Sequence, residues 1–83
     1  MFVYILYSVS ADKYYIGISE KPDERLQKHN SNHKGFTSLA NDWEIKFLEH
    51  YSTKTDALKR EREIKKWKSR KLVETLISRY ESR

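Results

Sequence analysis

The first nineteen residues contain two apolar, aromatic-rich runs separated by a short polar turn. The runs are Phe2–Tyr7 and Tyr14–Ser19, and the turn is Ser8–Lys13. Aromatic and β-branched residues favour strands, and a short turn between two such runs is typical of a β-hairpin. The sequence therefore predicts that the chain opens with a β-hairpin. Phe2–Tyr7 is apolar on both faces, so we expect it to be the central strand.

The rest of the chain predicts three helices and one more strand. The helices are predicted from the helical spacing of apolar residues. Their starts are indicated by Pro22 in a first turn and by the N-cap residues Thr53 and Ser69. The predicted elements are a helix from Pro22 to about Asn30, a loop over 31–41, a strand over 43–51, a helix over 54–68, and a last helix following Ser69. The order ββαβαα predicts an α+β fold, a small three-stranded antiparallel sheet flanked by three helices.

Size and composition favour one small domain over residues 1–83. The chain has no Cys, which excludes a disulfide framework and a thiolate zinc site and suits a reducing cytosol. The apolar run at the start is too short for a signal peptide or a membrane span. We therefore expect a soluble cytoplasmic protein with no membrane partner.

Positive charge is concentrated in the last third of the chain. Residues 1–53 carry six Lys or Arg and seven Asp or Glu, a net charge of −1, whereas residues 54–83 carry eleven and five, a net charge of +6. A basic face attracts polyanions, although many such faces are only solvated helix surface. The residues that could follow a nucleic-acid backbone are Lys65, Lys66, Lys68, Arg70 and Lys71.

Polar groups of the hairpin are placed to meet on one face. Tyr4 falls on one side of the first strand, and Tyr15 and Gly17 share one side of the second. A hairpin closing around Ala11 sets Tyr4 opposite Gly17. A glycine inside a strand indicates a close approach by a ring or a ligand. The simpler alternative is that both tyrosines are ordinary strand aromatics.

Two helices add charged residues to this set. Arg25 and His29 stand at i and i+4 on one face of the first helix, and an arginine there can bind phosphate oxygens. Glu61 lies on the apolar stripe of the helix over 54–68, where a carboxylate needs a cation to meet it. The partner is either Arg25, in a structural ion pair, or a metal ion.

Together these residues resemble the GIY-YIG endonuclease superfamily. Tyr15-Ile16-Gly17 matches the second motif, and Phe2-Val3-Tyr4 keeps the tyrosine of the first motif but not its glycine. The spacing of Arg25 and His29, and the helix that carries Glu61, also match. The small single-domain members, similar to the nuclease module of the bacterial excision-repair incision subunit, are the nearest in kind.

The resemblance implies a metal-dependent endonuclease that hydrolyses phosphodiester bonds in DNA. It implies that Glu61 holds one Mg²⁺ or Mn²⁺ ion, that Tyr4 acts as general base on a water or orients it, and that Tyr15 supports the nucleophile. Arg25 would bind the phosphate and stabilise its developing charge, and His29 would assist with proton transfer or contact the phosphate. A tyrosine base, with an ordinary pKa of about 10, requires the metal and Arg25 to lower that pKa.

Two alternatives remain open at this point. One is a module that binds branched DNA or RNA and cuts weakly or not at all. The other is an RNA-associated protein that uses only its basic third. The resemblance favours structure-selective cleavage linked to DNA repair or recombination. With 83 residues and no second DNA-binding domain among them, we also expect that a protein partner could supply specificity.

Overall fold

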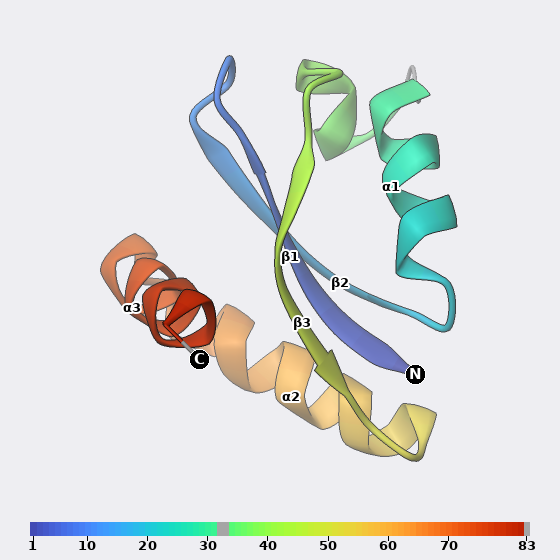
Figure 1. The fold of residues 1–83 in the computed structure, drawn as a ribbon, viewed down its shortest axis with the longest axis vertical. Coiled ribbons are helices and arrows are strands. Elements are labelled where there is room, and N and C mark those ends of the chain that lie inside the picture. The colour runs from blue at the N-terminus through green and yellow to red at the C-terminus, as the bar shows by residue number, and fades with distance from the viewer. Residues whose placement is uncertain (32–33, 83) are drawn as a thin grey trace.

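The computed structural model describes residues 1–31 and 34–82. Its elements follow the predicted order, with one short 3₁₀ helix added (Figure 1). They are β1 (Phe2–Ser8), β2 (Lys13–Ser19), α1 (Pro22–Ser31), the 3₁₀ helix η1 (Phe36–Leu39), β3 (Glu44–His50), α2 (Lys54–Lys66) and α3 (Arg70–Glu81). The α+β prediction, with three antiparallel strands and three α-helices, is confirmed.

The sheet has the order β2-β1-β3, so the most apolar strand is central as predicted. Both pairings are antiparallel. The hairpin register pairs Tyr4 with Gly17 and Leu6 with Tyr15. This register places the two tyrosines and the glycine on the same face of the sheet, as expected from the alternation of side chains. An irregularity between Ile5 and Leu6 interrupts the pairing of β1 with β3.

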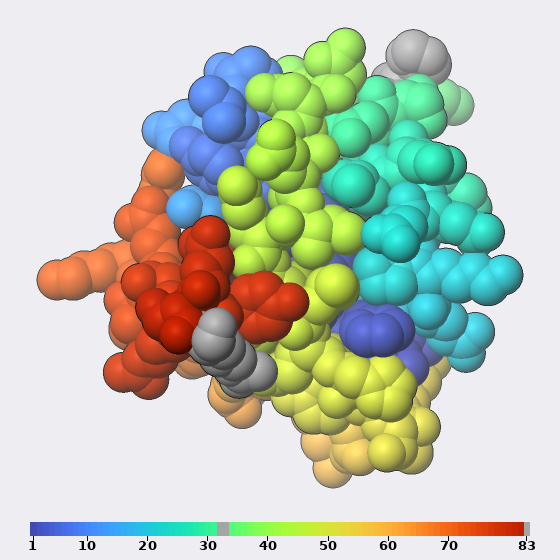
Figure 2. Space-filling view, in the orientation of Figure 1, coloured from blue at the N-terminus to red at the C-terminus, as the bar shows by residue number. Residues whose placement is uncertain are grey.

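Each face of the sheet is covered by different helices (Figure 1). On one face, Val3 and Ile5 of β1 pack with apolar residues of β3, α2 and α3. On the other, Tyr4 and Leu6 pack with Trp43, and Leu26 of α1 lies against them. Residues that alternate along β1 therefore serve two cores. Figure 2 shows the β3 segment at the surface between α1 and α3.

Local chemistry explains where the elements begin and end. The side chains of Thr53 and Ser69 accept hydrogen bonds from backbone N–H groups in the first turns of α2 and α3, so both predicted N-caps are confirmed. The helix predicted over 54–68 ends earlier, at Lys66. Lys68 has a φ of 46°, a left-handed conformation that ends an α-helix.

The strand predicted over 43–51 is shorter at both ends, because β3 spans Glu44–His50. Trp43 precedes it, and the side chain of Asn30 binds the Trp43 backbone in place of a strand partner. The Trp43 N–H donates to Asn30 Oδ1 at 2.7 Å, and Asn30 Nδ2 donates to the Trp43 carbonyl at 3.1 Å. This pair joins the end of α1 to the start of β3.

The predicted loop over 31–41 contains η1, which the sequence analysis did not predict. Residues 32 and 33 of that loop lie outside the described residues. Gly35 precedes η1 with a φ of 84°, a conformation that glycine adopts without a Cβ penalty. The turn that follows carries Phe36 and Thr37 to the face where Tyr4 lies.

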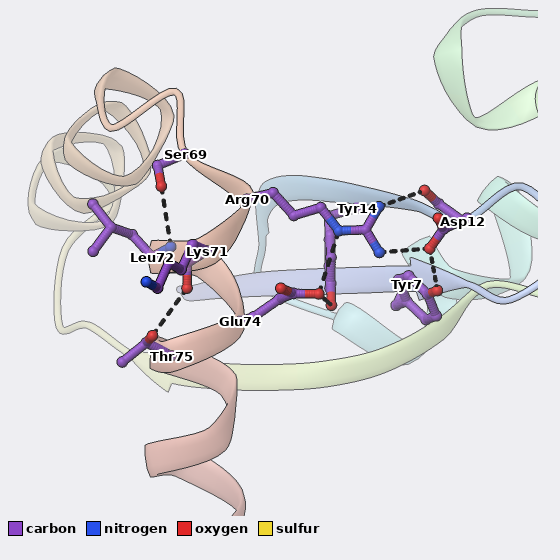
Figure 3. Close-up of polar contacts among 9 residues, drawn as sticks. All are labelled: Tyr7, Asp12, Tyr14, Ser69, Arg70, Lys71, Leu72, Glu74 and Thr75. Carbon is purple, nitrogen blue, oxygen red and sulfur yellow. Dashed lines mark hydrogen bonds and ion pairs between the residues drawn. The ribbon is translucent and has the colours of Figure 1, made fainter.

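The start of α3 is tied to the β1–β2 turn by a polar network (Figure 3). Arg70 Nη2 lies 2.5 Å from Asp12 Oδ1, and Arg70 Nε lies 3.3 Å from Glu74 Oε2. The Arg70 guanidinium also lies over the Tyr14 ring, 5.3 Å from its centroid. Within the described part of the chain, no helix combines the length and the apolar character that crossing a membrane requires.

Candidate active site

Gly17 is the position that lets the Tyr4 hydroxyl sit against β2. A Cβ built on Gly17 would lie 2.6 Å from the Tyr4 hydroxyl oxygen and 2.7 Å from its ring carbon Cζ. Real Cβ atoms do not approach other heavy atoms so closely, and Tyr4 itself is only 1% exposed. Any side chain at position 17 would push the tyrosine away. The missing side chain thus makes room for the Tyr4 ring, as the strand glycine suggested.

The Tyr4 hydroxyl is hydrogen-bonded to the histidine of α1. Tyr4 Oη lies 2.9 Å from His29 Nε2, and both residues are buried. The other ring nitrogen, Nδ1, lies 2.9 Å from Thr37 Oγ1 on η1. A neutral imidazole has one donor and one acceptor nitrogen, so Tyr4 and Thr37 take opposite roles toward it. The three side chains form a continuous chain from β1 through α1 to η1.

Sequence reasoning missed Thr37, because the segment around it read as a polar loop. Its side chain is buried, and its carbonyl oxygen accepts a 2.9 Å hydrogen bond from Nε1 of Trp43. Trp43 is also buried, and this hydrogen bond joins η1 to the residue that precedes β3. A large aromatic directly before a threonine, in a segment that is mostly polar, was the available signal.

Burial sets the protonation states of Tyr4 and His29. Desolvation raises the pKa of Tyr4, and the charges of Tyr15 and Glu61 raise it further, while Arg25 opposes the shift. Burial lowers the pKa of His29, and the positive charge of Arg25 lowers it further. At neutral pH the pair is therefore a neutral tyrosine beside a neutral histidine. The protein groups alone do not lower the Tyr4 pKa, contrary to what a free tyrosinate base requires.

Tyr15 and Arg25 complete the inner part of the site. The Tyr15 ring centroid lies 4.7 Å from that of His29 and 6.3 Å from that of Tyr4. Arg25 is exposed on α1, and its charge acts on both Tyr4 and His29. Arg25 also lines a surface hollow of about 380 Å³ with Lys28, His29 and Ser31. The site thus opens onto a positively charged surface that suits a phosphate.

Glu61 reaches the same site from α2. Its charge contributes to the raised pKa of Tyr4, so the carboxylate lies within electrostatic range of that hydroxyl. No ion pair among the described residues joins it to Arg25, so the alternative of a buried Glu61–Arg25 bridge is not observed. The Glu61 side chain is 16% exposed, and its Oε2 lies 3.6 Å from Nζ of Lys65.

The setting of Glu61 fits a divalent cation that keeps most of its water. Within the described ranges, no three His, Cys, Asp or Glu side chains gather into a ligand cluster. Mg²⁺ commonly binds one or two carboxylates and completes its shell with water and substrate phosphate. A partly exposed carboxylate within electrostatic range of Tyr4 meets that requirement, and a protein cage is unnecessary.

The predicted nucleic-acid residues divide into two groups. Lys65, Lys68 and Arg70 line a cleft of about 330 Å³ at the α2–α3 corner, together with Lys13 and apolar residues of β2, α2 and α3. Lys66 and Lys71 are exposed and lie outside the residues that line it. Arg70 is engaged by Asp12 and Glu74, which gives it a structural function in addition (Figure 3).

Comparison with known proteins gives one match. The family model of the GIY-YIG catalytic domain matches residues 1–74 of the 83-residue chain. No curated protein and no solved structure matches it significantly. The matched range contains every element from β1 to α2, and so the predicted site residues Tyr4, Tyr15, Gly17, Arg25, His29 and Glu61. The chain belongs to the GIY-YIG family of nuclease domains.

Proposed function

We propose that this protein is a divalent-metal-dependent endonuclease that hydrolyses phosphodiester bonds in DNA, acts in the cytoplasm, and selects its substrate by structure during repair or recombination. The observation that carries the proposal is the buried hydrogen-bonded chain of Tyr4, His29 and Thr37, reached by the charges of Arg25 and Glu61. A module that only binds nucleic acid has no need for a proton-transfer chain of this kind.

The hydrogen bonds suggest how the hydrolytic water loses its proton. As the water oxygen bonds to phosphorus and the P–O bond to the leaving oxygen breaks, the water passes its proton to the Tyr4 oxygen, while Tyr4 passes its own proton to Nε2 of the neutral His29. The leaving oxygen takes its proton from solvent. Nδ1–H then donates to Thr37 Oγ1, which holds the imidazole in the tautomer that can accept. Tyr4 remains neutral throughout, so its raised pKa is no obstacle. General acid–base groups of this type contribute about 10²–10⁴ in rate.

The remaining residues act on the phosphate. Arg25 binds the phosphate oxygens and stabilises the charge that develops on them. Tyr15 forms a hydrogen bond within the site and supports the position of the attacking water. Glu61 would hold the Mg²⁺ or Mn²⁺ ion, which when bound supplies positive charge near the phosphate and the leaving oxygen. The lysines of the α2–α3 corner would attract the rest of the strand.

A cleavage assay tests the proposal. Purified protein is incubated with nicked, flapped, forked and duplex DNA, and with matched RNA, in Mg²⁺ or Mn²⁺. We expect cleavage of at least one branched or nicked DNA, and loss of cleavage without the ion. Cleavage of RNA alone would assign a ribonuclease, and binding without cleavage of any substrate would assign the binding module.

Glu61→Ala is the matched control, and it also tests the role of that side chain. We expect cleavage to be lost while DNA binding is kept or tightened, since a negative charge leaves an anionic site. Stability should change little, because the i,i+4 contact of Glu61 with the half-exposed Lys65 contributes only about 0.3–0.5 kcal/mol. A loss of roughly 3–5 kcal/mol in the free energy of unfolding would indicate a buried bridge instead.

A further inference from the structure

Phe36 is a half-exposed aromatic residue beside the active site. Its side chain is 49% exposed. Its ring centroid lies 6.2 Å from that of Tyr15 with an interplanar angle of 27°, and 6.2 Å from that of Trp43. Isolated exposed apolar residues are common on protein surfaces. Phe36 differs because two aromatic side chains fix its orientation and leave about half of it open to solvent.

The ring of Phe36 is next to the proton-transfer chain. Tyr15 lies between Phe36 and His29, with ring centroids 4.7 Å apart on the His29 side. His29 in turn bonds the Tyr4 hydroxyl at 2.9 Å. A flat apolar surface therefore stands one aromatic ring away from the side chains that would act on the scissile phosphate.

Positive charge lies close to this surface. The hollow of about 380 Å³ on α1 is lined by Arg25, Lys28, His29 and Ser31. His29 connects it to η1 through Thr37, the residue after Phe36. Proteins that hold single-stranded nucleic acid combine basic grooves, which follow the backbone, with aromatic rings on which bases stack. Phe36 and the α1 hollow supply both components within one site.

We propose that Phe36 is the stacking platform for one unpaired nucleobase of the substrate, next to the phosphate that Arg25 binds. This inference rests on the proposed nuclease function and narrows its substrate class. Both faces of a base inside a continuous duplex are covered by its neighbours, so that base must leave the stack to reach Phe36. The site therefore selects DNA with an unstacked nucleotide beside the cleavage point, as at a flap, a gap or a bulge.

An abasic scan tests the stacking. A flapped DNA carries one abasic nucleotide, moved in turn through the three positions on each side of the cleavage point, and kcat/KM is measured for each. In the wild type we expect a loss of roughly five- to a hundredfold at one position and little change elsewhere, because base–aromatic stacking is of that strength. Phe36→Leu should cut the flapped DNA without an abasic nucleotide more slowly by a similar factor. At the position where the wild type loses activity, an abasic nucleotide should make no further difference to this variant.

Leu39→Ala is the matched control, since Leu39 lies on the same 3₁₀ helix and is 61% exposed. It should behave like the wild type, and Phe36→Trp should keep the position-specific loss. Thermal denaturation checks that each variant folds. If Phe36→Leu does not fold, the wild-type and Phe36→Trp scans decide the question.

Each contrary outcome has a distinct meaning. A flat scan in an active wild type, or an unchanged position-specific loss in folded Phe36→Leu, overturns the stacking proposal and leaves the nuclease function standing. Equal activity of wild type on continuous duplex and flapped DNA also overturns it. A wild type that neither binds nor cuts any nucleic acid overturns both proposals together.

Discussion

At the scale of single residues, the buried contact between Tyr4 and His29 decides what chemistry is available. Burial favours the neutral form of each side chain, because desolvation raises the pKa of Tyr4 and lowers that of His29. A neutral pair at 2.9 Å is suited to pass a proton along the hydrogen bond. The same burial makes a free tyrosinate unfavourable, so in the proposed mechanism the hydroxyl acts together with its histidine partner.

The two tyrosines should differ in their effect on rate. Tyr4→Phe keeps the ring beside Gly17 but deletes the hydroxyl, and we expect a loss of about 10²–10⁴ in kcat with the fold retained. Tyr15→Phe should cost less, because its hydroxyl is proposed only to support the water. Single-turnover cleavage by both variants measures this. Full activity of Tyr4→Phe would remove Tyr4 from the chemistry.

Thr37 should act as a positioning residue through His29. Thr37→Val deletes the partner of Nδ1, so the accepting tautomer is no longer fixed and kcat should fall about tenfold or more, whereas Thr37→Ser should restore it. The ¹⁵N shifts of the His29 ring report the tautomer directly. The pKa of His29 lies below its ordinary value of about 6.5. His29 must be neutral to accept a proton, so the wild-type rate should fall only when the pH is below about 6.5. A mere packing role for Thr37 would leave both the ¹⁵N shifts and the pH profile unchanged.

At the scale of elements, the contact between α3 and the β1–β2 turn is electrostatic. Arg70 begins α3 and pairs with Asp12 of the turn (Figure 3). Arg70 and Tyr7 hold the pKa of Asp12 at about 2 instead of 3.8. A depressed carboxylate pKa stabilises the fold above the unfolded pKa, and that contribution is lost as pH falls through the folded pKa.

Asp12→Asn should therefore flatten the pH dependence of stability in acid. In the wild type we expect the free energy of unfolding to fall from about pH 4 to about pH 2 partly through this pair, and the variant to lack that part. The pair is exposed, so added salt should reduce the difference. Chemical denaturation at pH 2, 3, 4 and 6 measures it. Parallel curves for the two proteins would mean that Asp12 contributes nothing.

At the scale of the whole molecule, the uneven charge of the sequence places the excess positive charge on particular helices. The tyrosines and the arginine of the candidate site come from the nearly neutral first part of the chain, and the excess positive charge comes from α2 and α3. These helices cover the face of the sheet opposite α1 (Figure 1). Glu61 and Lys65, one turn apart on α2, connect the site to the basic corner.

Binding should consequently depend on salt through that corner. Each phosphate contact on duplex DNA adds about 0.9 to the slope of log affinity against log salt, so replacing Lys65 and Lys66 by Gln should flatten the slope by up to about 1.8. The control replaces Lys54 and Lys59, exposed residues on the same helix. Equal slopes for the two double variants would return Lys65 and Lys66 to the solvated surface.

The sequence by itself determined the element order, the central position of β1, the hairpin register and both N-caps. All of these depend on local properties, namely side-chain alternation, cap chemistry and the short reach of a turn. The motif spacing also determined which polar residues to expect at the site, because each lies on a regular element with a known period.

Only the tertiary structure decided how these residues meet. Thr37 and Phe36 reach the site on a 3₁₀ turn held by Trp43, a contact made between separate segments that no local pattern encodes. The absence of an observed Glu61–Arg25 pair and the raised pKa of Tyr4 likewise depend on burial by several elements at once. Local sequence patterns determined the helices and strands. The packing of these elements determined the distances between the site side chains and their desolvation, on which the proposed chemistry depends.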